Sequence, residues 1–436
     1  MTPVMSEMRT AIIGTLIVTL GPLSLALYTP ALPMLVDAFH TTPSALKLTM
    51  TVYFFGFAFS QLACGPLSDA YGRRPVAIGF FVTYVLGSVL AALSSGVELL
   101  LVGRALQGIG AAAGVAISRA IVRDQFMGQE SARILNLIGL MLAVVPAVAP
   151  TLGGLILGVA GWHPIFLVMT AYGVMVLAAF GLGVKETNAN RNPEASRPAT
   201  VLRNYGALLS DRRFMRAGIV LGMALGGLYT LAALLPFVMI EKVGLTPTQF
   251  GLAMLWQTGA YTAGAAVTGR LLRRVEASRL IPFGLAFIVV GALGYAVGLR
   301  VLPATVVTVM LPIALWAFGI ALIMPGGTSD ALAGFPRMAG AASALIGFMQ
   351  IGGGLAGSAM AALLFADPYT AITTILPGMA VVAVASHLLL RAPVTRAEPE
   401  VKPEPGDLEV AVDPAGVLGA GGEEMEVSLH RPKNGP

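Results

Sequence analysis

Charged residues and cysteine are both scarce in this sequence of 436 residues. Asp, Glu, Lys and Arg make up 11% of it, against roughly 25% in an ordinary soluble domain. They are too few to cover the exterior of a soluble protein of this size. The single cysteine, Cys64, excludes an intrachain disulfide and a cysteine-rich metal site. Since the four histidines are scattered, we expect neither a metal site nor a cofactor.

The motifs of several common enzyme classes are also missing. The sequence has no GxxxxGK phosphate loop, which argues against ATP as an energy source. Neither HExxH nor GxSxG occurs. We therefore predict a protein that is not an enzyme and that has no nucleic-acid partner.

Hydrophobic residues dominate instead, at 56% of the chain, and the mean hydropathy is +0.81. Apolar runs of about 20 residues, long enough for a helix to cross a bilayer, occur twelve times. They lie near residues 11–35, 46–64, 76–95, 99–119, 134–158, 164–183, 217–240, 248–269, 279–299, 304–325, 341–365 and 370–390. A helix satisfies its own backbone hydrogen bonds in lipid, and the runs lack the alternation of barrel strands. The sequence predicts an all-α integral membrane protein with twelve transmembrane helices.

The basic residues are distributed unevenly between the two sides of these spans. When both termini are placed in the cytoplasm, the outer loops hold only Lys47, Lys242 and Arg300. Apart from Arg104, which falls inside a span, every other Lys and Arg is then cytoplasmic. This bias follows the positive-inside rule. It predicts a multi-pass protein of the bacterial inner membrane with both termini in the cytoplasm.

One long internal loop separates two sets of six spans. Its composition is that of a flexible cytoplasmic linker, and Val201–Leu209 within it has the pattern of a short amphipathic helix on the membrane surface. The end of the chain is rich in Pro, Gly and Glu, which predicts a disordered cytoplasmic tail. The expected parts are an N-terminal six-helix half at 1–183, the linker at 184–216, a C-terminal six-helix half at 217–390 and the tail at 391–436.

A specific motif, GPLSDAYGRRPV, lies between the second and third spans at residues 65–76. Its glycines permit a tight turn and close helix contact, and its aspartate can cap a helix or form an ion pair. A loop that serves topology alone explains the arginines but not the G-x-x-x-D-x-x-G-R-R spacing. The residues that carry this spacing are Gly65, Asp69, Gly72, Arg73 and Arg74.

At this motif the chain resembles the major facilitator superfamily of secondary transporters. The resemblance implies a fold of two six-helix halves and a role for the loop in locking their cytoplasmic side through charge pairs. Ala70 departs from the family, where a basic residue is common. The second half contains a degenerate copy of the motif, TGRLLRRVEASRL at residues 268–280, as expected of internal repeats.

Other segments resemble one branch of that superfamily, the bicyclomycin/chloramphenicol-resistance drug:proton antiporters. LYTPALP at 27–33 resembles the end of the first span in that branch. NYGALLSDRRFMR at 204–216 and AGAASALIGFMQ at 339–350 are also similar to it. The resemblance covers nearly the whole chain to about Arg391 and implies a small-molecule substrate and protons as the coupling ion.

The fifth span contains VVPAVAPTLGG, residues 144–154, which resembles the antiporter motif of the family, with Ala149 at the position of its first glycine. Prolines can kink a helix and glycines allow close approach of a neighbour. A kinked packing helix and a bend that favours alternating access both fit this pattern equally well. The residues concerned are Pro146, Pro150, Gly153 and Gly154.

An arginine lies inside the fourth span, in the segment RALQGIG, which matches the family's span-four motif at Arg104 and Gln107. At about 1.5 Å per residue, Arg104 lies roughly 9 Å deeper than Glu98 at the outer end of the span. It either extends outward to anchor the helix or faces the internal cavity. Intramembrane charges usually mark a pathway, which favours the cavity and a role in coupling.

No acidic residue falls in the middle of a span. Related drug antiporters often carry a carboxylate where this chain has Ala26, so the usual proton carrier is missing. Arg104 cannot replace it, because its guanidinium stays protonated at physiological pH. If protons do couple to transport, the remaining candidates are Asp37, Glu98 and Asp330.

The inferred substrate cavity is otherwise neutral and aromatic. For its tyrosines, packing or lipid contact is an equally good explanation, whereas an amide side chain in lipid would lack partners. The candidate substrate-binding residues are Tyr28, Tyr53, Asn136, Tyr229, Gln257, Tyr261 and Gln350.

These features predict a secondary transporter, by default a monomer, that works by alternating access in a lipid bilayer. The first hypothesis is proton-driven efflux of small amphipathic compounds, as in a multidrug antiporter. The alternative is a selective carrier or importer of a neutral or anionic metabolite, which Ala26 and Arg104 favour. A channel and a transport-dead sensor fit less well, because the paired halves and the gate motif favour alternating access and no folded signalling tail is expected.

Overall fold

Helices form all the regular structure of the described residues. The computed structural model describes residues 3–189, 191–335 and 338–390. Eleven helices within these ranges are long and apolar enough to cross a membrane. The chain is thus an all-α, multi-pass membrane protein, as its apolar runs predict.

The N-terminal half, as we use the term, consists of the elements before the linker. They are α1 (Glu7–Tyr28), η1 (Thr29–Ala31), α2 (Leu32–Ala38), α3 (Pro43–Tyr71), α4 (Arg73–Ala92), α5 (Val97–Arg123), α6 (Gly128–Ala160) and α7 (His163–Gly183). The linker contains η2 (Pro193–Ser196) and α8 (Pro198–Ser210).

The C-terminal half consists of the elements after the linker. They are α9 (Arg212–Pro236), η3 (Phe237–Lys242), α10 (Pro247–Ala253), α11 (Leu255–Leu271), η4 (Ala277–Leu280), α12 (Ile281–Leu293), η5 (Gly294–Gly298), α13 (Leu299–Val301), α14 (Val306–Ala333), α15 (Ala339–Leu363) and α16 (Pro368–Leu389).

The span expected at 248–269 is divided between α10 and α11. Met254 lies between them and keeps a helical backbone, with φ −61° and ψ −17°. Its N–H donates to the carbonyl of Phe250 over 3.1 Å, and the N–H of Thr258 donates to the carbonyl of Met254 over 3.2 Å. Because helical hydrogen bonds continue across the break, the two short helices together make the twelfth crossing.

Polar side chains begin several of the long helices. Thr42 precedes α3, Asp211 precedes α9 and Asp367 precedes α16, and each accepts hydrogen bonds from the first free amides of its helix. The first four amides of a helix have no partner within it, so such caps stabilise the starting point. These caps therefore fix the residues at which α3, α9 and α16 begin.

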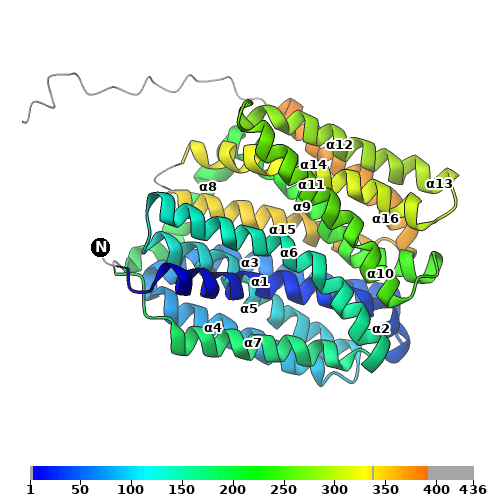
Figure 1. Ribbon diagram of the computed structural model, residues 1–436, viewed down its shortest axis with the longest axis horizontal. Coiled ribbons are helices and arrows are strands. Elements are labelled where there is room, and N and C mark those ends of the chain that lie inside the picture. Colours follow the sequence, from blue (N-terminus) through cyan, green and yellow to red (C-terminus); the bar gives the residue numbers. More distant parts are fainter. Residues whose placement is uncertain (1–2, 190, 336–337, 391–436) are drawn as a thin grey trace, which may run out of the picture. The chain divides into compact units, whose positions relative to one another are not determined.

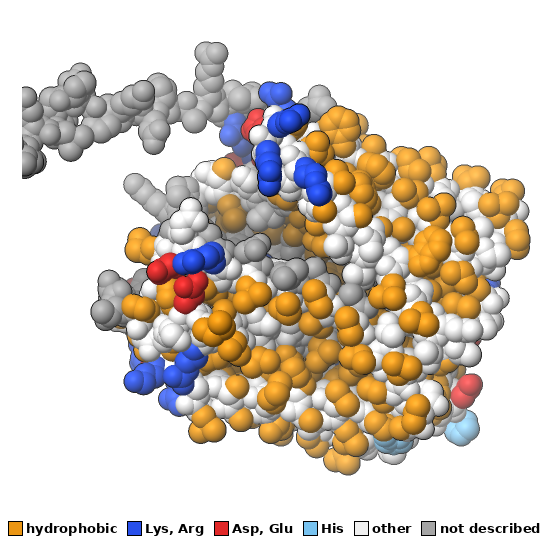
Figure 2. Space-filling model, viewed as in Figure 1, with side chains coloured by type: hydrophobic (Ala, Val, Ile, Leu, Met, Phe, Trp, Pro, Cys, Tyr) orange, Lys and Arg blue, Asp and Glu red, His pale blue; other side chains and the backbone are white. Residues whose placement is uncertain are grey.

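Each half has its own hydrophobic core. One group of buried side chains runs from Met5 to Val184 and includes three residues of the other half, Ala233, Phe237 and Ile351. The second group runs from Tyr205 to Ala383. The sides of the helical bundle carry many exposed apolar side chains, shown in orange in Figure 2, which suit contact with lipid.

The two ends of the bundle differ in charge. The linker end is defined here by Tyr71, Arg123 and Gly183, where helices finish near the linker; the far end is defined by Lys47 and Trp162. In Figure 1 the linker end lies on the left and the far end on the right. On the face drawn in Figure 2, Lys and Arg gather at the linker end, and a hollow between the two halves opens there.

The linker carries more structure than its composition suggests. The amphipathic helix expected at Val201–Leu209 is present as α8, with Tyr205 and Leu208 buried and Arg203 exposed. The Tyr205 hydroxyl donates to the carbonyl of Leu62 over 2.9 Å, which ties α8 to α3. The tail expected at 391–436 lies outside the described residues.

Candidate functional site

The motif between α3 and α4 forms an ionic network at the linker end. Arg73 forms an ion pair with Asp69, and its Nε lies 3.0 Å from Oδ2 of Asp124, the residue that follows α5. Gly72 makes the turn between the helices with φ 106°, a conformation that residues with a side chain rarely adopt. At Gly65, by contrast, an added Cβ would meet no described atom within 4 Å.

Glu186 completes this network from the linker. Its Oε1 accepts hydrogen bonds from the backbone N–H groups of Arg73 and Asn188, both over 2.9 Å, and its Oε2 accepts one from Arg74 N–H over 3.1 Å. The carboxylate therefore caps the N-terminus of α4, where the helix dipole favours negative charge. A Cβ at Gly72 would lie 2.5 Å from Glu186 Oε2, so glycine also leaves room for this cap.

Further linker residues attach to the same motif. The Asn188 side chain donates to the carbonyl of Asp69 over 3.0 Å, and the Asn192 N–H donates to the same carbonyl over 3.0 Å. Thr187 Oγ1 donates to Asp124 Oδ2 over 3.0 Å. The composition of this segment predicts a flexible linker and does not single out Glu186, although an acidic residue just after the sixth span is a usable signal.

Arg104 is fully buried between two tyrosine rings. Its guanidinium carbon lies 4.4 Å from the ring centroid of Tyr28 and 4.3 Å from that of Tyr53. Its Nη1 donates to Gln107 Oε1 over 2.9 Å and to the Ser24 carbonyl over 3.3 Å. Cation–π contacts of this kind contribute about 2 kcal/mol or more when they are desolvated. The charge is therefore stabilised by neutral groups of α1, α3 and α5.

The groups around Arg104 are held by a second set of hydrogen bonds. Tyr28 Oη pairs with Thr49 Oγ1 over 2.8 Å, and Tyr53 Oη donates to the Gly21 carbonyl over 3.0 Å. Gln107 Nε2 donates to Ser88 Oγ over 2.8 Å, which adds α4 to the cluster. Arg104 thus points into the N-terminal half instead of toward lipid, and two expected substrate-binding tyrosines cover it.

The other expected cavity residues lie on different helices. Tyr229 on α9 contacts Phe54 of the other half, with ring centroids 5.4 Å apart. The side chain of Asn136 lies outside the described residues. Half-buried positions on α11 and α15 hold the remaining three, which are Gln257, Tyr261 and Gln350.

The three carboxylates considered as proton sites have different surroundings. Asp37 and Glu98 are exposed at the far end. Asp330 is half-buried at the linker end, and its Oδ2 lies 3.2 Å from Nη2 of Arg216. Of these three carboxylates, Asp330 is therefore the one that forms a described ion pair between two helices, α9 and α14 of the C-terminal half.

Two adjacent glycines of α6 contact both halves. A Cβ at Gly153 would lie 2.4 Å from the carbonyl oxygen of Leu27 on α1, and one at Gly154 would lie 2.3 Å from that of Pro247 on α10. Thr151 Oγ1 adds a hydrogen bond of 3.0 Å to the Gly251 carbonyl. α6 remains helical through Pro146 and Pro150, which both lie within it.

The charge distribution counts Lys47 with the outer loops although it lies at the start of the span expected at 46–64, and the structure places it within α3, where it is fully buried. Its Nζ donates to the carbonyls of Ala361 over 2.7 Å and Phe365 over 2.6 Å, both in the other half. One helical turn further, Thr51 Oγ1 donates to Ser358 Oγ over 3.1 Å. The loop assignment was wrong because α3 begins at Pro43, before Lys47. The partners of Lys47 were not predictable, because they are backbone carbonyls at the end of α15, which no local pattern reveals.

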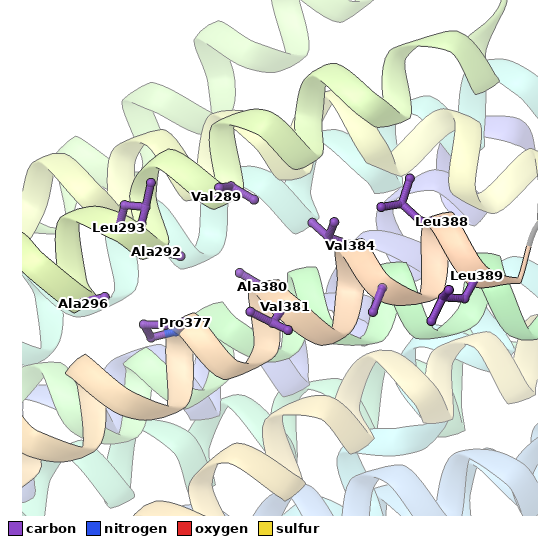
Figure 3. Close-up of a pocket in the computed structure, with 11 residues that line it drawn as sticks. Val289, Ala292, Leu293, Ala296, Pro377, Ala380, Val381, Val384, Leu388 and Leu389 are labelled. Carbon is purple, nitrogen blue, oxygen red and sulfur yellow. The ribbon is translucent and has the colours of Figure 1, made fainter.

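A separate groove of about 530 Å³ lies between α12 and α16 in the C-terminal half (Figure 3). Its lining is apolar, with Leu293, Val381 and Leu388 among the side chains drawn. Since it presents no charged or amide side chain among its lining residues, it offers no means of selecting a polar substrate. The hollow between the halves is the better candidate pathway.

Curated relatives are similar over most of their length. An uncharacterized MFS-type transporter of Bacillus subtilis, YdgK, is 31% identical over 356 residues, covering 81% of this chain and 87% of that protein. A chloramphenicol resistance protein of Pseudomonas aeruginosa is 30% identical over 346 residues, covering 78% and 80%. A bicyclomycin resistance protein homolog of Haemophilus influenzae is 26% identical over 355 residues, covering 79% and 86%.

Solved structures share the fold at low identity. The human organic anion transporter MFSD10 (TETRAN) matches with a TM-score of 0.64 and 18% identity, covering 89% of this chain and all of that one (100%). A D-xylose–proton symporter matches with a TM-score of 0.65 and 13% identity, covering 87% and 97%. The family model described as Major Facilitator Superfamily matches residues 14–358. The chain belongs to the major facilitator superfamily.

Proposed function

We propose that this protein is a proton-driven exporter of small amphipathic compounds in the bacterial inner membrane. Two of the relatives that match most of its length are named as chloramphenicol and bicyclomycin resistance proteins. The distribution of basic residues supports an orientation with both termini in the cytoplasm. With two homologous halves in one chain, a monomer is sufficient to form the pathway.

The observation that supports alternating access is the difference in how the two halves meet at the two ends of the bundle. At the far end, hydrogen bonds from Lys47, Thr51 and Thr151 join the halves. At the linker end a hollow opens between them (Figure 2). In the proposed orientation this state is open to the cytoplasm and closed to the outside, and rocking of one half against the other would reverse it.

The expected site residues take distinct roles in this proposal. The network of Asp69, Gly72, Arg73 and Arg74, with Gly65 one helical turn before it, forms the cytoplasmic gate element. Arg104 lies between Tyr28 and Tyr53 and is bonded to Gln107, so this pair would act on the pathway through the two tyrosines. Direct contact with the substrate is assigned to the remaining candidates, Asn136, Tyr229, Gln257, Tyr261 and Gln350.

For proton coupling we favour Asp330 over Asp37 and Glu98. Its carboxylate is paired with Arg216 and is only half-buried. Protonation would remove the charge that holds Arg216 and so change the contact between α9 and α14. The two exposed carboxylates have no such link to a second helix among the described ion pairs.

A selective carrier or importer of a neutral or anionic metabolite is the second candidate. One specific observation favours it: the described partners of Arg104 are neutral, so its positive charge is not neutralised by a carboxylate. Such a charge attracts an anionic group when the cluster opens. The missing carboxylate at Ala26 acts in the same direction.

Accumulation assays in pump-deficient bacteria separate the two candidates. Cells expressing the protein would receive labelled cationic, neutral and anionic compounds, with and without collapse of the proton gradient. Lowered accumulation of several unrelated compounds, restored by the collapse, is the expected result. Raised accumulation of one neutral or anionic compound, with no efflux of the others, would contradict the export proposal and support the carrier.

A further inference from the structure

We propose that Lys47 is the latch of the far-end gate, whose release allows that end to open. This inference rests on the alternating access proposed above. Lys47 is fully buried, and its ammonium joins α3 of one half to the carbonyls of Ala361 and Phe365 in the other. It is neither part of the linker-end motif nor one of the expected site residues.

The end of α15 is a favourable place for this cation. Ala361 lies in the last turn of α15 and Phe365 lies just beyond it. The last carbonyls of a helix lack partners within the helix and carry the negative end of its dipole. The two hydrogen bonds from the charged donor therefore satisfy the buried carbonyl of Ala361 in the last turn and the half-buried carbonyl of Phe365 just beyond it.

The position of Lys47 makes these bonds dependent on the conformation. They link the two halves, so they exist only while the halves are in contact at the far end. Thr51 and Ser358 extend this contact between α3 and α15, which we call the far-end seam, by one helical turn, and both are buried. When the far end opens, the ammonium and the two carbonyls are all exposed to water, which replaces the lost bonds. Lys47 thus favours the closed state without preventing the open one.

The far end supplies a matched control in Lys242. Lys242 pairs with Asp367 over 3.2 Å and lies over the ring of Tyr369, but both partners belong to its own half. Its side chain is 46% exposed. The same substitution at Lys242 therefore removes a far-end cation without removing a bond between the halves.

The test measures how often the far end opens, through the reactivity of a cysteine in the seam. Ser358→Cys would be introduced into the full chain with Cys64→Ser, and its rate of reaction with N-ethylmaleimide measured in reconstituted vesicles. Ser358 is fully buried in the closed state, so the rate follows the open fraction. Lys47→Met should raise the rate about tenfold, the equivalent of 1.4 kcal/mol. Lys242→Met should leave it unchanged.

Lys47→Gln provides a second variant in case Lys47→Met fails to fold, because its amide can still donate one hydrogen bond. We expect an intermediate rate for Lys47→Gln in protein that elutes as a single gel-filtration peak. An unchanged rate in folded Lys47→Met or Lys47→Gln would overturn the latch, as would an equal increase in Lys242→Met. No substrate is present in this assay, so its outcome is independent of whether the accumulation assay supports export.

Discussion

Arg104 and Lys47 are both fully buried cations, but one lies within a half and the other lies between the halves. Arg104 stacks between Tyr28 and Tyr53 and bonds to side chains and backbone of its own half. Lys47 bonds to backbone carbonyls of the opposite half. Under the alternating access proposed above, contacts within a half would persist throughout the transport cycle, whereas contacts between the halves would set the balance of conformations.

The linker end extends this comparison. The ion pairs of Arg73 remain within the N-terminal half, and that of Arg216 with Asp330 remains within the C-terminal half. These charge pairs thus each stabilise one half at the linker end. In the proposed cycle, the described hydrogen bonds between the halves that would break at the far end join α3 to α15 and α6 to α10.

The largest effect is expected from Arg104→Ala, which should lower stability as well as abolish transport. The change removes two cation–π contacts and the bond to Gln107, at a cost of about 2–4 kcal/mol in the free energy of unfolding. Arg203→Ala, at an exposed position of α8, is the control and should change neither quantity. Thermal unfolding of the purified proteins and substrate efflux are the two measurements.

Arg104→Lys sharpens the same point, because lysine keeps the charge but cannot stack its head group flat on both rings. We expect it to resemble Arg104→Ala more than the parent. Parental unfolding temperature and parental efflux in Arg104→Lys would show that the tyrosine rings do not stabilise the guanidinium.

Gly154→Val should have the next largest effect, through the contact between halves. The new side chain would meet the Pro247 carbonyl, since even a Cβ lies 2.3 Å from it. Overpacking of this kind costs about 1–3 kcal/mol and should lower efflux by about tenfold. Gly158→Ala is the control, because its Cβ would lie at an ordinary 3.5 Å from Thr248 Oγ1. Equal efflux in both variants would show that the α6–α10 seam need not close tightly.

Glu186→Gln should reduce efflux by a few-fold. An amide oxygen caps α4 more weakly than a carboxylate, by about 1 kcal/mol or less. Both carboxylate oxygens of Glu186 accept backbone N–H bonds, and an amide has only one acceptor oxygen. The control is Glu194→Gln, because the ion pair of Glu194 with Arg197 lies entirely within the linker. If the initial rates of efflux of the two variants are alike, the linker does not contribute to the gate.

The smallest effect is expected from Lys242→Met. Burial raises the pKa of Asp367, but hydrogen bonds from Thr370 and the ion pair with Lys242 outweigh it and hold the pKa below its usual value. The carboxylate is therefore charged at neutral pH, and the stability that it contributes is lost only as the pH falls through this lowered pKa. Removing an exposed partner should change the free energy of unfolding by less than about 1 kcal/mol at neutral pH. A larger loss in the unfolding measurement would mean that the exposed pair matters as much as the buried cations.

The spans were predictable from the sequence because a helix that crosses a bilayer needs about 20 consecutive apolar residues, and this local pattern is visible in the sequence. The break at Met254 was not, since the helix keeps its apolar pattern on both sides of it. The contacts of Arg104 were only partly predictable: its depth follows from its distance from Glu98, but its tyrosine partners depend on how α1 and α3 pack around α5.

Contacts between distant segments were the least accessible to sequence reasoning. The partners of Lys47 were not predictable because they are carbonyls some 300 residues away in the chain, as the sequence separation of 314 to Ala361 shows. The sequence shows Glu186 only as one more charge in a polar linker. Its capping role could not be predicted, because it depends on where the α4 amides lie in space. In both residues the partner is a backbone atom, which the side-chain pattern of the sequence does not record.

A reversible cross-link across the far-end seam tests alternating access most directly. Thr51→Cys with Ser358→Cys, in a chain carrying Cys64→Ser, places two thiols where the hydroxyl oxygens lie 3.1 Å apart. Disulfide formation would be verified by mass spectrometry and efflux measured before oxidation, after it and after reduction. The account predicts that oxidation stops efflux and that reduction restores it. Parental efflux by the cross-linked protein would contradict the claim that the halves separate at the far end during transport.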